Sequence, residues 1–295
     1  MIERVDDFIL EKNRTRMSTS LNTINTPNTD ICIVNPIDRL SNVLDRLESV
    51  CADDDVQADN SEPTVQITDR VSIVIPVFNE ENTIGLVVSR VAALPLNSEI
   101  VIVDDFSTDG TREILSKLDG IQSLKVILKD QNEGKGAALR TGFEHATGEF
   151  VVVQDADLEY HPKDIPGLLV PLINEECDIV YGSRFIGHEL QDESWIHRFG
   201  NWTLTTASNM FNGVHLTDME TCYKAFRRST LKGIRIRQNR FGVEPELTAK
   251  WARRGFRFKE VPISYNARGY DDGKKIGIRD LFQAIYCIFR YGFAD

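Results

Sequence analysis

The chain has 295 residues, of which 41% are hydrophobic and 27% are charged, and its formal net charge is -11. This length suits one large α/β domain or two small ones, and the ordinary globular composition supplies enough apolar residues for a core. The negative net charge argues against a protein that binds nucleic acid.

The chain shows no sign of secretion or of a membrane-spanning helix. Its first ten residues lack the apolar core of a signal peptide, and no stretch approaches the roughly 20 apolar residues of a spanning helix. The five cysteines have no paired spacing and no histidine cluster nearby, which favours reduced thiols over disulfides or zinc. We expect a cytoplasmic protein, either soluble or attached peripherally to the cytoplasmic face of a membrane.

Residues 1–68 differ in composition from the rest of the chain. They are rich in Asn, Thr, Ser and Asp, and acidic residues outnumber basic ones. Apolar residues between Ile37 and Leu47 have helical spacing, which predicts one short amphipathic helix. We predict a disordered or loosely docked acidic arm over residues 1–68, followed by an α/β domain over residues 69–295.

In chain order, the first half of this domain alternates between strand and helix patterns. The expected strands cover 71–76, 99–103, 124–128 and 151–153, and the expected helices cover 83–94, 111–118 and a segment that starts near Gly134. Such alternation is typical of a mostly parallel, Rossmann-like sheet flanked by helices.

The second half continues with longer helices. Helices are expected over 165–174, 194–211 and from about 243 to 252, and strands over 178–181 and 257–265. The strongly apolar segment 281–293 is expected to be buried rather than to lie in a bilayer interface. Lys and Arg are in excess after Lys224, which indicates a phosphate-binding or anionic-membrane surface, with a solvated face as the alternative.

Carboxylates follow two of the predicted strands. Asp155, Asp157 and Glu159 come directly after the strand 151–153, and Asp105 follows the strand 99–103. Ligands of open α/β sheets bind beyond the carboxyl ends of the strands, so Asp155 and Asp157 are placed to bind a divalent cation together with phosphate oxygens. A solvated acidic turn is the alternative.

Glycines surround Lys135 at the start of the helix that follows the third strand. Gly134 and Gly136 permit close backbone approach, and free N–H groups together with Lys135 could bind an anion there. The stretch lacks both the dinucleotide-binding Gly-x-Gly-x-x-Gly pattern and the phosphate-binding loop of nucleotide triphosphatases. The sequence therefore supports neither a dehydrogenase nor such a triphosphatase.

Taken together, these stretches resemble family-2 glycosyltransferases with the GT-A fold, and most of all the polyprenyl-phosphate (dolichyl-phosphate) mannosyl or glucosyl synthases. The resemblance covers residues 71 to about 280. Six stretches carry it: Ile75-Pro76-Val77-Phe78-Asn79-Glu80, Val103-Asp104-Asp105-Phe106-Ser107-Thr108-Asp109-Gly110-Thr111, Asn132-Glu133-Gly134-Lys135-Gly136, Asp155-Ala156-Asp157-Leu158, Gly182-Ser183-Arg184-Phe185 and Val261-Pro262-Ile263-Ser264-Tyr265.

The resemblance implies a role for each matching position. Asp155 and Asp157 would hold Mg²⁺ or Mn²⁺ against the diphosphate of a UDP- or GDP-hexose donor, with Glu159 as a third ligand. The remaining implied residues are those that line the base and ribose pocket, Pro76, Phe78, Glu80 and Asp105, and those that bind the phosphates of donor and acceptor, Arg184, Arg198, Arg268 and Lys275. The acidic arm and the loop 270–275 depart from the family pattern.

The identity of the acceptor decides whether a base is needed. A polyprenyl phosphate acceptor is already ionised at pH 7, so cationic groups that orient it are enough. A hydroxyl acceptor on a glycan, protein or small molecule requires a general base, for which Asp218 and Glu220 are the candidates. A third hypothesis is a sugar-nucleotide-binding subunit without turnover. The sequence does not indicate the donor base or the oligomeric state.

Overall fold

The computed structural model describes residues 69–187, 195–266 and 278–293. The predicted acidic arm, residues 1–68, lies outside the described residues, and so do Arg268 and Lys275.

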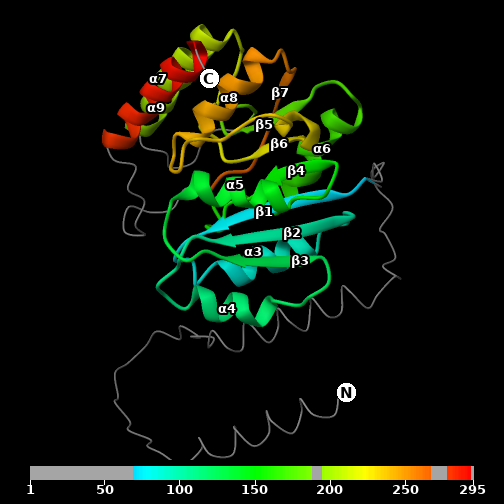
Figure 1. Cartoon of the computed structure of the whole chain (residues 1–295). Helices are drawn as coiled ribbons and strands as arrows, with labels where there is room; N and C mark the ends of the chain where they lie inside the picture. The colour runs from blue at the N-terminus through cyan, green and yellow to red at the C-terminus, as the bar shows by residue number, and fades with distance from the viewer. Residues whose placement is uncertain (1–68, 188–194, 267–277, 294–295) are drawn as a thin grey trace, which may run out of the picture. The chain divides into compact units, whose positions relative to one another are not determined.

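A seven-stranded sheet organises the described part of the chain (Figure 1), in the order β3-β2-β1-β4-β6-β5-β7. The strand β6 is antiparallel to both of its neighbours, and every other pairing is parallel. The predicted mostly parallel sheet is therefore confirmed. The strands are β1 Val71–Val77, β2 Ser98–Asp104, β3 Leu124–Leu128, β4 Phe150–Val153, β5 Ile179–Ser183, β6 Lys224–Arg227 and β7 Phe258–Pro262.

Helices cover both faces of this sheet. Figure 1 shows α5 on one side of the strands β1–β3 and the helices α3 and α4 on the other. A short 3₁₀ helix, η1, leads into α6 and contacts α3. The described helices are α3 Ile84–Ala92, α4 Thr111–Leu118, α5 Lys135–His145, η1 Pro162–Asp164, α6 Ile165–Ile173, α7 Trp195–Asn212, η2 Arg228–Leu231, α8 Val243–Arg253 and α9 Ile278–Phe293.

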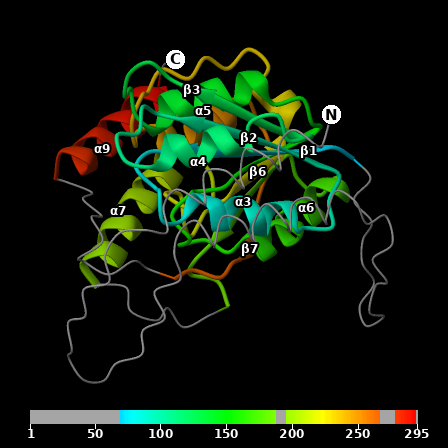
Figure 2. The same ribbon diagram turned by 90° about the horizontal axis from the view of Figure 1, so that it is seen from below.

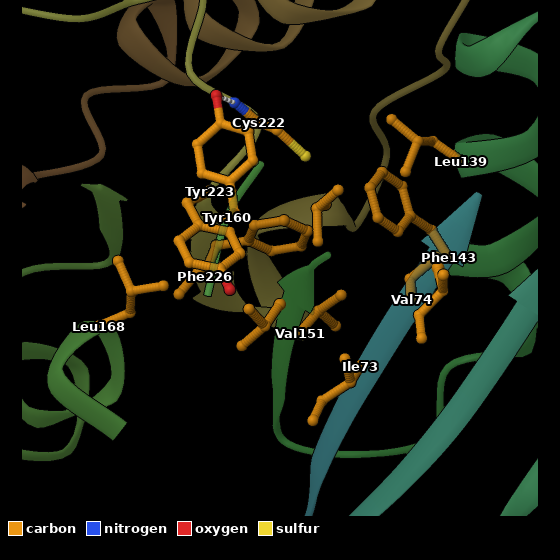
Figure 3. Close-up of a cluster of buried hydrophobic side chains, with 14 of the residues drawn as sticks. Ile73, Val74, Leu139, Phe143, Val151, Tyr160, Leu168, Cys222, Tyr223 and Phe226 are labelled. Atoms are coloured by element: carbon orange, nitrogen blue, oxygen red, sulfur yellow. Dashed lines mark hydrogen bonds between the residues drawn. The ribbon is translucent and has the colours of Figure 1, made fainter. Parts of the chain in front are cut away.

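The core is built on the central strands, because β1 and β4 are apolar and buried almost throughout. On one face, the Phe226 ring of β6 packs against Phe143 of α5 and Trp251 of α8, with centroid distances of 5.4 and 4.9 Å. Towards the carboxyl ends of the strands, the Tyr160 ring packs against the tilted Tyr223 ring, with the ring centroids 4.9 Å apart (Figure 3). The aromatic core thus continues up to the segments that follow β4 and precede β6.

The strand β6 was not predicted from the sequence. It has only four residues, and its ends are the cations Lys224 and Arg227, so it lacks the apolar run that marks the other strands. Pairing with both β4 and β5 buries it in the sheet. Because β6 runs antiparallel, its beginning lies at the edge of the sheet where β4 and β5 end.

Candidate active site

The carboxyl ends of the parallel strands bring the predicted site segments to one edge of the sheet. The pairing of Val77 with Asp104 places Phe78 next to Asp105, directly beyond the strands β1 and β2. The segment from Gln154 follows β4, Arg184 follows β5, and the residues before Lys224 approach the same edge from the other direction. This is the edge at which open α/β sheets bind their ligands.

Asp105 holds the loop that leads to Lys135. Its buried carboxylate accepts hydrogen bonds from Lys129 Nζ at 2.7 Å and from the backbone N–H groups of Glu133 and Gly134 at 3.1 and 2.6 Å. Hydrogen bonds to the buried Asp105 carboxylate therefore fix the loop 129–134 to the end of β2.

The other residues predicted to line the nucleotide pocket lie in β1 or directly after it. Pro76 is inside β1, and Glu80 accepts a hydrogen bond from the Thr83 hydroxyl at 2.6 Å. Phe78 leaves 45% of its surface exposed directly beyond the strand. Phe106, which sequence reasoning did not single out, is 39% exposed and has the Arg112 guanidinium 4.8 Å from its ring centre. Two exposed aromatic rings thus follow neighbouring strands.

Asp155 and Lys135 form the central ion pair of the site. The Lys135 Nζ atom lies 2.9 Å from Asp155 Oδ1 and 3.4 Å from Glu244 Oε1. Burial on its own would lower the pKa of Lys135, but the negative charges of Asp155 and Glu244 raise it well above its usual range. Burial likewise opposes ionisation of Asp155, and the Lys135 charge nevertheless lowers the pKa of that carboxyl. Both groups are therefore charged at pH 7.

The other two predicted metal ligands differ from each other. Asp157 is half-buried, and its Oδ1 accepts the backbone N–H of Glu159 at 3.1 Å. Glu159 is buried, and its Oε2 accepts a hydrogen bond from the Tyr265 hydroxyl at 3.0 Å. Within the residues that the structure describes, no group of three His, Cys, Asp or Glu side chains is arranged to hold a metal ion. The assignment of Asp155 and Asp157 as metal ligands therefore stays a prediction.

Arg184 and Asp218, which were predicted for different roles, form a buried ion pair. Arg184 Nε and Nη2 donate to the two carboxylate oxygens of Asp218 at 2.6 and 2.8 Å, and Arg184 N–H donates at 3.2 Å. The Asp218 side chain is fully buried, and the guanidinium also lies 5.1 Å from the centre of the Tyr265 ring. Both carboxylate oxygens of Asp218 are therefore engaged by the Arg184 side chain.

Glu220 is the second candidate base, and its environment favours the protonated form. Burial, with the nearby charge of Glu244, raises the pKa of Glu220 to about 8. Its Oε1 atom is buried and has no hydrogen-bond partner. Lys224, a residue that sequence reasoning missed, is buried 4.6 Å from the centre of the Tyr181 ring, and burial lowers its pKa.

The structure describes two of the predicted phosphate-binding arginines, Arg184 and Arg198. Arg198 is exposed on α7, whereas Arg268 lies outside the described residues, as does Lys275. A contact between these groups and Arg184 stays a prediction.

The amino end of α5 is covered by the protein's own backbone. Ala137 N–H donates to Asn239 O at 3.1 Å, and a Cβ atom on Gly136 would lie 2.3 Å from Gln238 O. Gly134 has φ +102°, and a Cβ there would lie 2.5 Å from Asn239 O. The backbone segment that closely approaches Gly134 and Gly136 is thus segment 238–240 of the same chain. The N–H group of Ala137 is used by this segment, whereas the Lys135 side chain contacts Asp155 at the site edge.

An exposed apolar surface lies on α7 and α9, which pack side by side (Figures 1 and 2). We call it the α7–α9 face, and it consists of Phe199, Trp202, Met210, Tyr286, Phe289 and Phe293, which are 44–72% exposed. The opposite side of α9 is buried through Ala284, Cys287 and Ile288. The expected burial of segment 281–293 is thus correct for one side of the helix only.

No described helix is long and apolar enough to cross a membrane.

Known proteins resemble this chain in sequence. The family described as glycosyl transferase family 2 matches residues 72–235. The undecaprenyl-phosphate 4-deoxy-4-formamido-L-arabinose transferase of Aeromonas hydrophila is 31% identical over 222 residues, which cover 73% of this chain and 65% of that protein. The dolichol-phosphate mannosyltransferase of Pyrococcus furiosus is 30% identical over 230 residues, which cover 75% of this chain and 63% of that protein. The matches span less than two thirds of either relative.

Solved structures resemble the fold. The glucosyl-3-phosphoglycerate synthase of Mycobacterium tuberculosis superposes with a TM-score of 0.60 at 20% identity, over 85% of each chain. The same protein in complex with Mg²⁺ and uridine diphosphate gives a TM-score of 0.59 at 20% identity, over 93% of this chain and 87% of that one. The likeness establishes the GT-A fold that the sequence predicted.

Proposed function

We propose that this chain, which belongs to glycosyltransferase family 2, transfers a hexose from a nucleoside-diphosphate sugar to a polyprenyl phosphate. The names of the Aeromonas and Pyrococcus relatives each contain such a lipid phosphate, which supports this class of acceptor. UDP and GDP both remain candidate donor nucleotides. The observation that carries the choice of acceptor is the buried pair of Arg184 and Asp218.

That pair favours an acceptor that needs no base. Both carboxylate oxygens of Asp218 are engaged by the bidentate contact with Arg184. Of the two candidate bases, only Glu220 then has a carboxyl oxygen without a hydrogen-bond partner, so Glu220→Gln is the variant that tests for a base. A phosphate monoester is ionised without help, and a cation such as Arg184 can orient it or the donor diphosphate.

We assign a divalent cation, Mg²⁺ or Mn²⁺, to Asp155 and Asp157. The two carboxylates suit the cation because Mg²⁺ is commonly bound by one or two carboxylates and substrate phosphates. Asp155 is 19% exposed, so phosphate oxygens can approach it. A cation held by these residues would stabilise the negative charge of the leaving diphosphate. Glu159 would have to release the Tyr265 hydroxyl to become a third ligand.

The α7–α9 face supports a peripheral position on a lipid bilayer. Its aromatic residues recur at helical spacing along each helix, and arginines adjoin them in the pairs Arg198–Phe199 and Phe289–Arg290. Aromatic side chains next to cations are typical of helices that lie in a membrane interface. A lipid-linked acceptor would be presented at the same surface.

The test of the proposed function is a transfer assay with UDP- and GDP-hexoses, with and without a short polyprenyl phosphate, on the wild type and on Glu220→Gln. We expect transfer only with the lipid phosphate, and a loss smaller than about 10-fold in Glu220→Gln, because no proton leaves the nucleophile. The rate should fall as the pH falls through the second pKa of the acceptor phosphate, about 6.

A hydroxyl acceptor gives the opposite result. Glu220→Gln should then lose at least about 100-fold in kcat, the scale of general-base catalysis, and transfer should not require the lipid phosphate. Donor binding without transfer to any acceptor would support the third hypothesis, a nucleotide-sugar-binding subunit. Either result would overturn the proposed acceptor.

A further inference from the structure

Lys135 lies between two carboxylates that come from different elements. Its Nζ atom is 2.9 and 3.1 Å from the two oxygens of Asp155, which follows β4, and 3.4 Å from Oε1 of Glu244, in the first turn of α8. The Lys135 and Asp155 side chains retain 18% and 19% exposure, whereas Glu244 retains 7%. The Lys135 ammonium therefore connects Asp155, at the site edge, to the more deeply buried Glu244.

The contact with Glu244 is incomplete. A charge-assisted N–H···O bond is usually about 2.7–2.9 Å long, so 3.4 Å is a loose ion pair. The second oxygen of Glu244, Oε2, is buried and has no hydrogen-bond partner. A buried carboxylate oxygen without a donor is unfavourable, so Glu244 has unused capacity to accept the Lys135 ammonium.

We propose that Lys135 is a displaceable counter-ion, which moves from Asp155 onto Glu244 when a divalent cation binds to Asp155. The inference rests on the proposed metal site of Asp155 and Asp157. A divalent cation and an ammonium on one carboxylate repel each other, and both bind the same oxygens. Moving the ammonium to Glu244 removes this competition without a proton transfer and leaves every buried charge with a partner.

Lys135 and Glu244 are positioning residues in this scheme. Lys135 keeps Asp155 ionised and oriented, and Glu244 determines whether Lys135 can leave. The chemistry of the site gives each residue a distinct effect on metal affinity, which can be measured without any transfer reaction.

The test is a double-mutant cycle on Mn²⁺ affinity, read from the electron paramagnetic resonance signal of free Mn²⁺ with UDP or GDP present. The proteins are the wild type, Glu244→Gln, Lys135→Gln and the double variant, and Asp157→Asn defines binding at the site. Glu244→Gln should weaken Mn²⁺ binding by about 10-fold when Lys135 is present, and by less than about 3-fold in the Lys135→Gln background. Circular dichroism checks that each variant is folded, and Lys135→Met replaces Lys135→Gln if that variant is not.

The possible results separate the two proposals. Equal effects of Glu244→Gln in both backgrounds would mean that Glu244 acts on the metal only as a distant charge, and the displacement would be refuted while the metal site stands. If Asp157→Asn binds Mn²⁺ as the wild type does, or if the wild type binds none, the proposed metal site is wrong and the displacement falls with it.

Discussion

At the scale of single residues, burial decides what the ion pair of Arg184 and Asp218 does. Removing one partner of a buried pair leaves a charge in a poorly solvated position, which typically costs about 3–5 kcal/mol. We therefore expect Asp218→Ala to lower the free energy of unfolding by about 3–5 kcal/mol, measured by urea denaturation. The loss would come from the contacts with the Asp218 carboxylate that the Arg184 guanidinium, beside Tyr265, would no longer have.

The chain contains a matched control for this prediction. Asp178 also accepts the Nε, Nη2 and backbone N–H groups of its arginine, Arg257, at 3.1, 3.1 and 2.9 Å, but Arg257 is 56% exposed. Water and salt screen an exposed pair, so Asp178→Ala should cost about 1 kcal/mol or less. Similar losses in the two variants would show that burial of the Asp218 pair contributes little.

The sequence predicted the residues of this pair but not their contact. Both Arg184 and Asp218 were selected as site residues, one as a phosphate ligand and the other as a base. They are far apart in the chain, and they meet because the strand β6 enters the sheet beside β5. No local pattern predicts β6, because its first and last residues are Lys224 and Arg227. Hydrophobic periodicity therefore could not predict that Arg184 and Asp218 meet.

At the scale of elements, the start of α5 depends on glycine because another backbone segment lies against it. A Cβ on Gly136 would lie 2.3 Å from Gln238 O and 3.0 Å from Arg240 O. Backbone atoms cannot turn aside as side chains do, so segment 238–240 would have to shift. We expect Gly136→Ala to lower the free energy of unfolding by about 1–3 kcal/mol, measured by urea denaturation.

Gly167 in α6 is the control, because a Cβ there meets nothing within 4 Å. With free space around it, alanine only improves helix propensity, and Gly167→Ala should raise stability by about 0.5–1 kcal/mol. A stabilising effect at both positions would mean that segment 238–240 yields easily. The glycines themselves were evident in the sequence. The partner that requires them was not, since it lies about a hundred residues further along the chain.

At the scale of the whole molecule, charge and apolar surface are unevenly distributed. The formal net charge is -11, yet Lys and Arg are concentrated after Lys224, the part of the chain that includes α8 and α9. The α7–α9 face adds exposed aromatic side chains to this region. Trp202 is 61% exposed, and its ring contacts that of Phe199, with the ring centroids 5.8 Å apart. Helical periodicity could not distinguish a core stripe from this second, exposed stripe.

The excess of Lys and Arg after Lys224, together with the α7–α9 face, predicts binding to an anionic bilayer. We expect the wild type to sediment with vesicles of phosphatidylcholine and phosphatidylglycerol, and less in high salt, because salt screens the attraction to anionic lipid. The variant Trp202→Ser/Phe289→Ser should bind at least about 10-fold more weakly, since each aromatic ring contributes apolar area to the interface.

The control for vesicle binding is Leu128→Ser, which removes an apolar side chain that is 46% exposed at the end of β3, away from α7 and α9 (Figure 1). Leu128 is as exposed as Phe289, so a non-specific loss of surface hydrophobicity would weaken both variants alike. A membrane contact confined to the α7–α9 face leaves Leu128→Ser at the wild-type affinity. If the wild type does not sediment with any vesicle, or if Leu128→Ser loses as much as the aromatic variant, the α7–α9 face is not the membrane-binding surface.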